Sequence, residues 1–196
     1  MDSIDSLFNV KYNNEPPLAG KLLIAEPFLT DYPFCRSVVL LVNHSTESSM
    51  GLVLNVPIQQ SLNHVVTELQ SIETIPLYRG GPLGEDILFF IHTYGCIEGA
   101  FPISEGLYLN GDFDLVKNLL IKGSLDPKQF RFFLGYSGWG ASQLETELEH
   151  DAWLVTCSSS QYIIEQNPHK LWEGLLHRMG NKYKIWARYP LIPTHN

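Results

Sequence analysis

The sequence predicts an α+β fold in one domain. Short apolar runs typical of strands alternate with amphipathic runs at helical spacing, which favours sheet and helices in one layered system. The chain has 196 residues, 44% of them hydrophobic. A chain of this size buries roughly 70% of its unfolded surface on folding, so one core needs no disulfide or metal. No repeat, low-complexity tract or linker divides the sequence. We therefore expect strands and about four helices in one layered system.

The domain is expected to span residues 18–196, after an N-terminal arm of residues 1–17. Pro16 and Pro17 stop regular structure between these two parts. The acidic start of the chain has no apolar segment behind it, which argues against a signal peptide.

The first half of the domain predicts three strands and a helix. The strands are expected at 21–25, 37–43 and 50–55. The second is apolar on both faces and so central, and its short connection to the third favours an antiparallel hairpin. Ser61 is a good N-cap for a helix of roughly 61–70, with an apolar stripe of Leu62, Val65, Val66 and Leu69.

The second half predicts more short strands and two longer helices. Strands are expected at 76–79, 87–93, 107–109 and 152–156, with an irregular loop over 94–105 and another around 158–160. Asp112 can cap a helix over about 113–122. Pro168 suits the first turn of a helix that reaches Met179 and ends at Gly180.

The segment of residues 130–148 organises the prediction. It begins as an aromatic, apolar strand and ends with Ala141, Leu144 and Leu148 at helical spacing. Between these parts, Gly135, Gly138 and Gly140 permit positive φ and close backbone approach. We therefore expect a strand, a tight glycine-rich turn and a helix.

This glycine-rich segment and five others resemble the AlgH-like (YqgE) family of bacterial proteins. The matching segments, in the family's order, are Gly20–Ala25, Arg36–Leu40, Met50–Asn55, Gly80–Pro82 with Ile91 and His92, Gly135–Gly140 leading into Gln143–Glu145, and Asp151–Val155. The resemblance implies a mixed, strongly bent, partly barrel-like sheet with helices packed on it. The family's biochemical activity is not established, although a label of transcriptional regulator accompanies the AlgH name.

Composition narrows the class of partner and the compartment. The chain has three widely spaced cysteines, Cys35, Cys96 and Cys157, and no Cys-x-x-Cys pair. This odd number and spacing favour reduced thiols in the cytoplasm. No apolar run approaches the length of a membrane span. The net charge of −8 argues against nucleic acid as a partner. A basic group of Arg178, Lys182, Lys184 and Arg188 is better explained by a helix C-terminus and a solvated segment.

Two chemical hypotheses concern the glycine-rich segment. In the first, Ser137 is the nucleophile of a hydrolase, because Gly135-Tyr136-Ser137 begins a Gly-x-Ser-x-Gly pattern. Trp139 breaks that pattern, and no histidine and acid follow Ser137 at suitable places, so we name no catalytic residue. The structural alternative is that Ser137 satisfies backbone groups in a tight turn.

In the second hypothesis, free backbone N–H groups at the start of the helix bind a small anion. Such a site needs a cationic partner, and Arg36 and Arg79 are the candidates, unless they pair with acidic residues instead. His92, at the end of an apolar strand, is a possible neighbour and otherwise a hydrogen-bonded core residue. The spacing of the histidines predicts no metal site, and no cofactor motif is present.

The sequence therefore predicts a cytoplasmic binding or regulatory module rather than an enzyme. Its partner is an unidentified protein or small ligand, and its oligomeric state is open. A small-anion or metabolite-binding protein, a Ser137 hydrolase and a DNA-binding regulator are the alternatives. The candidate ligand-binding residues are Arg36, Arg79, His92, Tyr136, Ser137, Gly138, Trp139 and Gly140.

Overall fold

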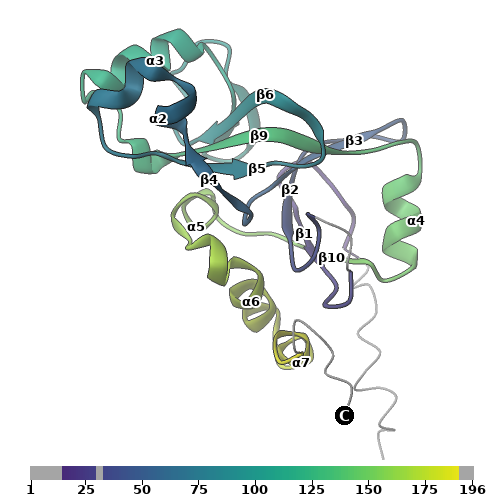
Figure 1. Cartoon of the computed structure of the whole chain (residues 1–196). Coiled ribbons are helices and arrows are strands. Elements are labelled where there is room, and N and C mark those ends of the chain that lie inside the picture. The colour runs from purple at the N-terminus through teal and green to yellow at the C-terminus, as the bar shows by residue number, and fades with distance from the viewer. Residues whose placement is uncertain (1–14, 30–32, 190–196) are drawn as a thin grey trace, which may run out of the picture.

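A computed structural model describes residues 15–29 and 33–189. Most of the predicted N-terminal arm and the last seven residues of the predicted domain lie outside these ranges. Figure 1 shows a curled sheet at the centre of the molecule. Helices α2 (Leu62–Val65) and α3 (Phe113–Ile121) lie at one end, and α4 (Gln143–Glu149) lies at the other.

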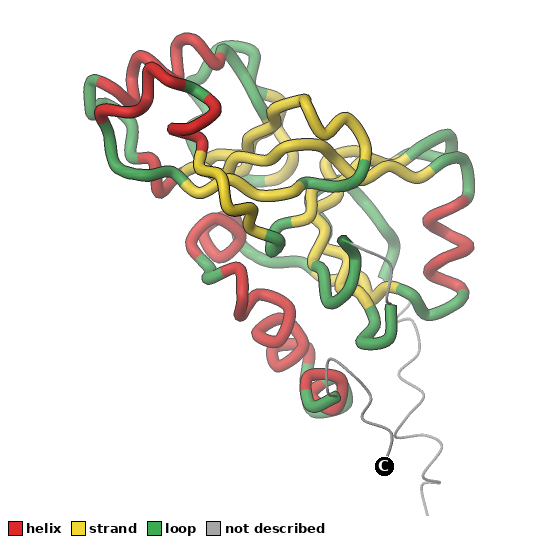
Figure 2. The backbone as a smooth tube through the Cα atoms, viewed as in Figure 1, coloured by secondary structure: helices red, strands yellow, loops and turns green. Residues whose placement is uncertain are grey.

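The described strands form one ten-stranded, half-barrel sheet, seen as the yellow tube in Figure 2. The main path runs β10-β1-β2-β3-β9-β6-β8-β7, and β4 joins it through β5. Its members are β1 (Leu22–Ala25), β2 (Val38–His44), β3 (Ser49–Val53), β4 (Pro57–Ser61), β5 (Pro76–Arg79), β6 (Leu83–His92), β7 (Phe101–Ser104), β8 (Leu107–Leu109), β9 (Phe130–Trp139) and β10 (Trp153–Thr156). All described pairs are antiparallel except β5 with β9. The mixed, strongly bent sheet and the β2–β3 hairpin are as predicted.

Strand β9 is the element that connects the two halves of the sheet. Its residues 132–134 pair with β5, and its residues 137–139 pair with β3. Gly135, between these two registers, has φ +72°. The strand therefore changes neighbours at a glycine, where an ordinary L-residue would be strained.

The remaining helical segments are short, apart from one. They are η1 (Thr67–Ser71), η2 (Pro127–Gln129), α5 (Ser160–Glu165), α6 (Pro168–Met179) and α7 (Lys184–Ala187). Helices α5, α6 and α7 follow one another along the underside of the sheet in Figure 1. Helix α6 has the predicted bounds, and it buries Leu171, Trp172, Leu175 and Leu176. The predicted Asp112 cap is also confirmed, because its Oδ1 accepts a hydrogen bond from the Leu115 N–H.

The tight glycine-rich turn predicted within residues 135–140 is wrong. Strand β9 continues through Trp139, and the turn to α4 occupies residues 140–142, with Ser142 at φ 56°. Of the three predicted glycines, Gly135 does serve close backbone approach, and Gly80 and Gly81 lie on the other side of this contact. A Cβ added to Gly80 would lie 2.2 Å from the Gly135 carbonyl oxygen, and one added to Gly81 would lie 2.1 Å from the Tyr136 carbonyl carbon.

The single helix predicted over 61–70 is also wrong. Helix α2 ends at Val65, and Val66 is extended before η1 begins. Asn63 explains the interruption. Its side chain donates to the Leu69 carbonyl at 2.6 Å and accepts from the Ile75 N–H at 2.8 Å, so the chain folds around this amide.

Five short elements were absent from the prediction, and the helical segments η2 and α7 are two of them. Strand β4 is mostly exposed, β7 lies within the predicted loop 94–105, and α5 follows the Ser159 cap. Each is only a few residues long, so periodicity gives little signal.

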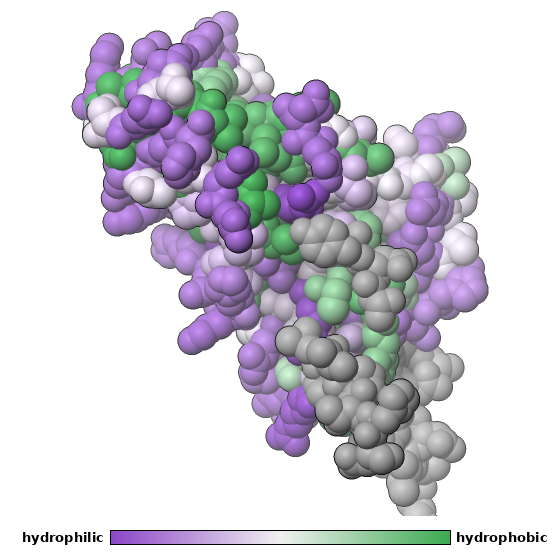
Figure 3. Space-filling view, viewed as in Figure 1, coloured by the Kyte–Doolittle hydropathy of each residue, from purple (hydrophilic) through white to green (hydrophobic). Residues whose placement is uncertain are grey.

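The core lies on both faces of the curled sheet. All four tryptophans, Trp139, Trp153, Trp172 and Trp186, are at most 5% exposed and pack in the core. In the view of Figure 3, hydrophilic residues cover much of the surface, with a band of hydrophobic residues across its middle. Leu83 and Ile87 of β6 are 44% and 47% exposed.

Candidate functional site

Ser137 is a structural hydrogen-bond donor in this fold. Its side chain is fully buried, and its hydroxyl donates to the Gly80 carbonyl at 3.1 Å. Gly80 also accepts from the Val53 N–H at 2.8 Å. Ser137 of β9 is thus joined to Gly80, which is itself hydrogen-bonded to the last residue of β3. The buried Ser137 hydroxyl is closed to a substrate.

The predicted backbone anion site is occupied by the chain itself. The Gly140 N–H donates to the Gln143 side chain at 3.0 Å, and α4 has only seven residues. Gln143 continues to Glu147, whose carboxylate also accepts from the indoles of Trp139 and Trp153. Of the predicted segment, Tyr136 and Gly138 are partly exposed and Gly140 is exposed.

Arg79 is the predicted cation that lies nearest to this segment. It precedes Gly80, and its guanidinium forms an ion pair with Glu85 of β6. A cleft of about 380 Å³ opens beside it, lined also by Ile58, Gln59, Gln60 and Leu134. Arg79 therefore pairs with an acidic residue, which was the structural alternative to anion binding.

Arg36 and His92 lie elsewhere in the fold. Arg36 has φ 51°, donates to the Tyr189 carbonyl and lies over the Trp172 ring, 4.9 Å from its centroid. His92 pairs with Phe130 at the first residue of β9. At about 3.3 Å per residue, roughly 20 Å of strand separate His92 from Ser137. The structure brings Arg79, Tyr136 and Ser137 together but not Arg36 or His92.

His92 is a buried, fully hydrogen-bonded core residue. Its Nε2 donates to the Asn110 carbonyl at 2.7 Å, and its Nδ1 accepts from the Tyr94 N–H at 3.2 Å. Burial lowers the pKa of His92 below its ordinary value, outweighing these two hydrogen bonds. The neutral imidazole therefore suits both contacts.

A second histidine forms part of a polar chain at the β2–β3 hairpin. His44 Nδ1 lies 2.8 Å from Ser49 Oγ, and its Nε2 lies 3.7 Å from a carboxylate oxygen of Glu145. Ser49 is 5% exposed, so its hydroxyl is closed to substrate despite the resemblance to a nucleophile–base–acid series. This series of polar side chains connects α4 to the β2–β3 hairpin.

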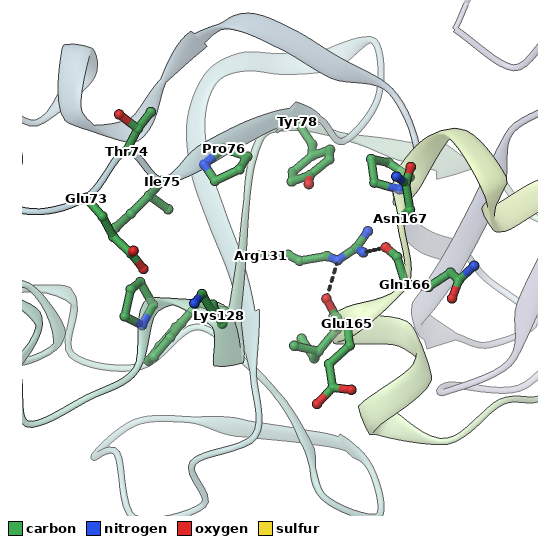
Figure 4. Close-up of a pocket in the computed structure, with 14 residues that line it drawn as sticks. Glu73, Thr74, Ile75, Pro76, Tyr78, Lys128, Arg131, Glu165, Gln166 and Asn167 are labelled. Atoms are coloured by element: carbon green, nitrogen blue, oxygen red, sulfur yellow. Dashed lines mark hydrogen bonds between the residues drawn. The ribbon is translucent and has the colours of Figure 1, made fainter.

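The site that sequence reasoning missed surrounds Arg131. A cleft of about 450 Å³ lies between the start of β5, the start of β9 and the α5–α6 connection. Its lining side chains are drawn in Figure 4. This volume is in the range of small-molecule sites. The residues that line it are Glu73, Thr74, Ile75, Pro76, Tyr78, Pro127, Lys128, Phe130, Arg131, Ile164, Glu165, Gln166, Asn167 and Pro168.

Arg131 is 4% exposed, and its guanidinium is held by main-chain carbonyls. It donates to Leu54 and Ile164, each at 3.0 Å, and to Gln166. The guanidinium carbon also lies 5.3 Å from the centroid of the Tyr78 ring. Burial lowers the pKa of Arg131 below its ordinary value, yet an arginine remains charged at neutral pH. One signal for this site was present in the sequence, because Arg131 interrupts an aromatic strand.

Two absences concern the described residues alone. Within 15–29 and 33–189, no group of three or more His, Cys, Asp and Glu side chains is placed to hold a metal ion. None of the helices in these ranges has the length and apolarity that crossing a bilayer requires.

Comparison with known proteins agrees with this architecture. A half-barrel sheet with helices at its ends and underside defines the AlgH class of fold. The solution structure of AlgH from Pseudomonas aeruginosa superposes with a TM-score of 0.70 at 28% identity, covering 90% of this chain and 96% of that one. A crystal structure from Corynebacterium diphtheriae gives a TM-score of 0.73 at 22% identity, covering 94% and 98%.

The sequence comparison places the chain within a family. The AlgH-like family model matches residues 22–184, so the chain belongs to the AlgH-like family. A UPF0301 protein of Bacteroides thetaiotaomicron is 47% identical over 195 residues, 99% of this chain and all of that protein. Another from Parabacteroides distasonis is 38% identical over 198 residues, covering both chains completely. The family resemblance seen in the sequence is thereby confirmed.

Proposed function

We propose that this protein is a binding module for a small molecule, with its site in the Arg131 cleft. The observation that carries the proposal is a cavity of about 450 Å³ with a nearly fully buried arginine in its wall. Buried charged groups at clefts are more common at functional sites than elsewhere. The burial of Ser137 and Ser49 supports binding rather than hydrolysis by either serine.

The cleft beside Arg79 is a second candidate site, and it retains part of the sequence prediction. Arg79 and Leu134 line it, next to the Gly135–Gly140 segment. Arg79 is already paired with Glu85, so an anion there would compete with an existing carboxylate. We therefore rank this cleft below the Arg131 cleft.

The test is thermal unfolding with a panel of nucleotides, sugars, amines, carboxylates and neutral aromatic compounds. A ligand at about 100 times its Kd adds about 2.7 kcal/mol to the free energy of unfolding. For a chain of this size, that raises the Tm by about 5–10 °C.

A matched pair of variants assigns the site. Thr74 is exposed and lines the Arg131 cleft, so Thr74→Trp should fill the cleft and remove the ligand's effect. Ser71 is exposed and does not line the cleft, so Ser71→Trp should leave the effect intact. A Tm shift that survives Thr74→Trp, or a panel without any shift, would contradict a binding function for this cleft.

A further inference from the structure

The Arg131 guanidinium has more N–H donors than hydrogen bonds, and no described carboxylate balances its charge. It carries five N–H groups, and three hydrogen bonds engage it. All three acceptors are neutral carbonyls. No ion pair joins Arg131 to a carboxylate in the described ranges. Carbonyls satisfy individual donors but leave the positive charge in place, and an uncompensated buried charge is costly.

The other charged groups of the cleft lie at its rim. Lys128 is exposed, and it too forms no ion pair with a described carboxylate. Glu73 and Glu165 also line the cleft but are exposed, so water screens their repulsion of an anion. Because Arg131 is buried, its attraction for a ligand anion is screened far less. The α6 N-terminus at Asn167 and Pro168 adds positive potential on the same side.

The rest of the lining sets the shape and polarity of the ligand. Ile75, Pro76, Phe130 and Pro168 are apolar, and Tyr78 adds an aromatic ring beside Arg131. A small inorganic anion would leave this surface without contact. A ligand with an apolar or aromatic body would cover it, and a planar carboxylate matches the fork of guanidinium donors.

We propose that the cleft binds an organic carboxylate, whose carboxyl group pairs with Arg131 and whose apolar body lies against Tyr78 and the prolines. Lys128 adds attraction at the mouth. This inference rests on the proposed function, because it names the ligand class of the same cleft.

The experiment compares carboxylates with their uncharged amides on the unmodified protein. Isotope-labelled protein is titrated with benzoate and benzamide, indole-3-acetate and indole-3-acetamide, and hexanoate and hexanamide, in a buffer free of carboxylate and phosphate. The chemical shifts of the protein's backbone N–H groups, followed by NMR, locate the bound compound. We expect the carboxylates to shift residues in the segments 73–78, 127–131 and 164–168, with affinities about tenfold or more above those of the amides.

Charge variants provide the control. Lys128→Glu should weaken carboxylate binding about fivefold and leave amide binding unchanged. Lys122→Glu changes the net charge equally at an exposed residue outside the cleft, so its affinities should match those of the unmodified protein. Arg131→Gln should remove the preference for carboxylates. If that variant does not fold, the comparison of carboxylates and amides still decides.

The outcomes separate the two proposals. Amides that bind the cleft as tightly as carboxylates would overturn the carboxylate class and keep a small-molecule site. Inorganic phosphate is added as a further titrant. If it binds the cleft more tightly than the carboxylates, the carboxylate class is likewise overturned and the small-molecule site is kept. Carboxylates that shift only residues outside the cleft, or probes that shift none, would overturn the carboxylate proposal; a blank thermal panel would then remove the proposed function as well.

Discussion

At the scale of residues, His92 shows how burial fixes a protonation state. Nδ1 accepts from a backbone N–H, so a proton added there would face another donor. The aromatic rings of Phe90, Tyr108 and Phe130 surround the imidazole at centroid distances of 5.4–5.8 Å. Desolvation is the main cause of its lowered pKa.

The pH dependence of stability follows from this lowered pKa. The unfolded chain binds the His92 proton below about pH 6.5, whereas the native protein binds it only at lower pH. The contribution of His92 to stability is therefore full above about pH 6.5 and is lost as pH falls through the native pKa. Urea unfolding between about pH 7.5 and 5 should show a weaker pH dependence for His92→Gln than for the unmodified protein. The exposed His169→Gln variant should keep the original slope, and equal slopes in all three proteins would refute the prediction.

Gly135 provides a second prediction at this scale. Its φ is +72°, and an added Cβ would lie 2.7 Å from the Gly81 oxygen and 2.8 Å from the Leu83 oxygen. Gly123 has φ +68° but no atom within 4 Å of such a Cβ. Gly123→Ala should cost about 1 kcal/mol of unfolding free energy from backbone strain alone. Gly135→Ala should cost about 3 kcal/mol or more, because backbone must also move. If urea unfolding shows similar losses for the two variants, the contact between Gly135 and the carbonyls of Gly81 and Leu83 tolerates a side chain.

At the scale of elements, Glu147 attaches α4 to the sheet. One of its carboxylate oxygens accepts from the indole N–H of Trp139 at 2.9 Å and of Trp153 at 2.7 Å. Trp139 belongs to β9 and Trp153 to β10, which are not neighbours in the sheet, so the carboxylate links two separate strands to α4. The helix itself is short, and a short helix depends on tertiary contacts for its stability.

Removal of this carboxylate should loosen α4. Glu147→Ala leaves two buried indole N–H groups without their acceptor, which should cost about 2–4 kcal/mol. Urea unfolding followed by tryptophan fluorescence measures the loss. Glu149→Ala, two residues away and exposed, should change stability by less than about 0.5 kcal/mol. A Glu147→Ala variant as stable as Glu149→Ala would show that packing alone holds the helix.

At the scale of the whole molecule, charge bears on the alternative of DNA binding. The net charge is −8, and the predicted basic group holds only four of the 13 lysines and arginines. Arg178 lies over the Tyr162 ring at 4.3 Å, and Lys184 donates to Asn181 at 2.9 Å. These contacts are compatible with the structural interpretation of that group.

We therefore expect no binding of duplex DNA even at low ionic strength. Fluorescence anisotropy of a labelled duplex at about 50 mM salt should stay flat as protein is added, because few phosphates can be neutralised. A rise in anisotropy that falls steeply with added salt would contradict this expectation. In that case Lys182 and Arg188 would be the first residues to substitute.

Much of the fold was predictable from local patterns. The apolar strand at 38–42, the Asp112 cap and the Pro168 start of α6 are encoded by neighbouring residues, whose burial and backbone conformation follow from short-range rules. The half-barrel bend was implied by family resemblance rather than by any single pattern. The continuation of β9 through Gly135 was missed, because glycines that permit a turn also permit two chains to cross.

The sequence by itself determined the class of fold, most strands and the long helix, because periodicity and caps act over a few residues. Only the tertiary structure decided which of the predicted site residues meet. It placed Arg36 against Trp172, Arg79 against Glu85, and His92 at the far end of β9. It also enclosed Arg131 of β9 between the segment that follows β3 and the end of α5, through carbonyls of residues 54, 164 and 166. These contacts join residues far apart in the chain, and their geometry depends on how the sheet bends.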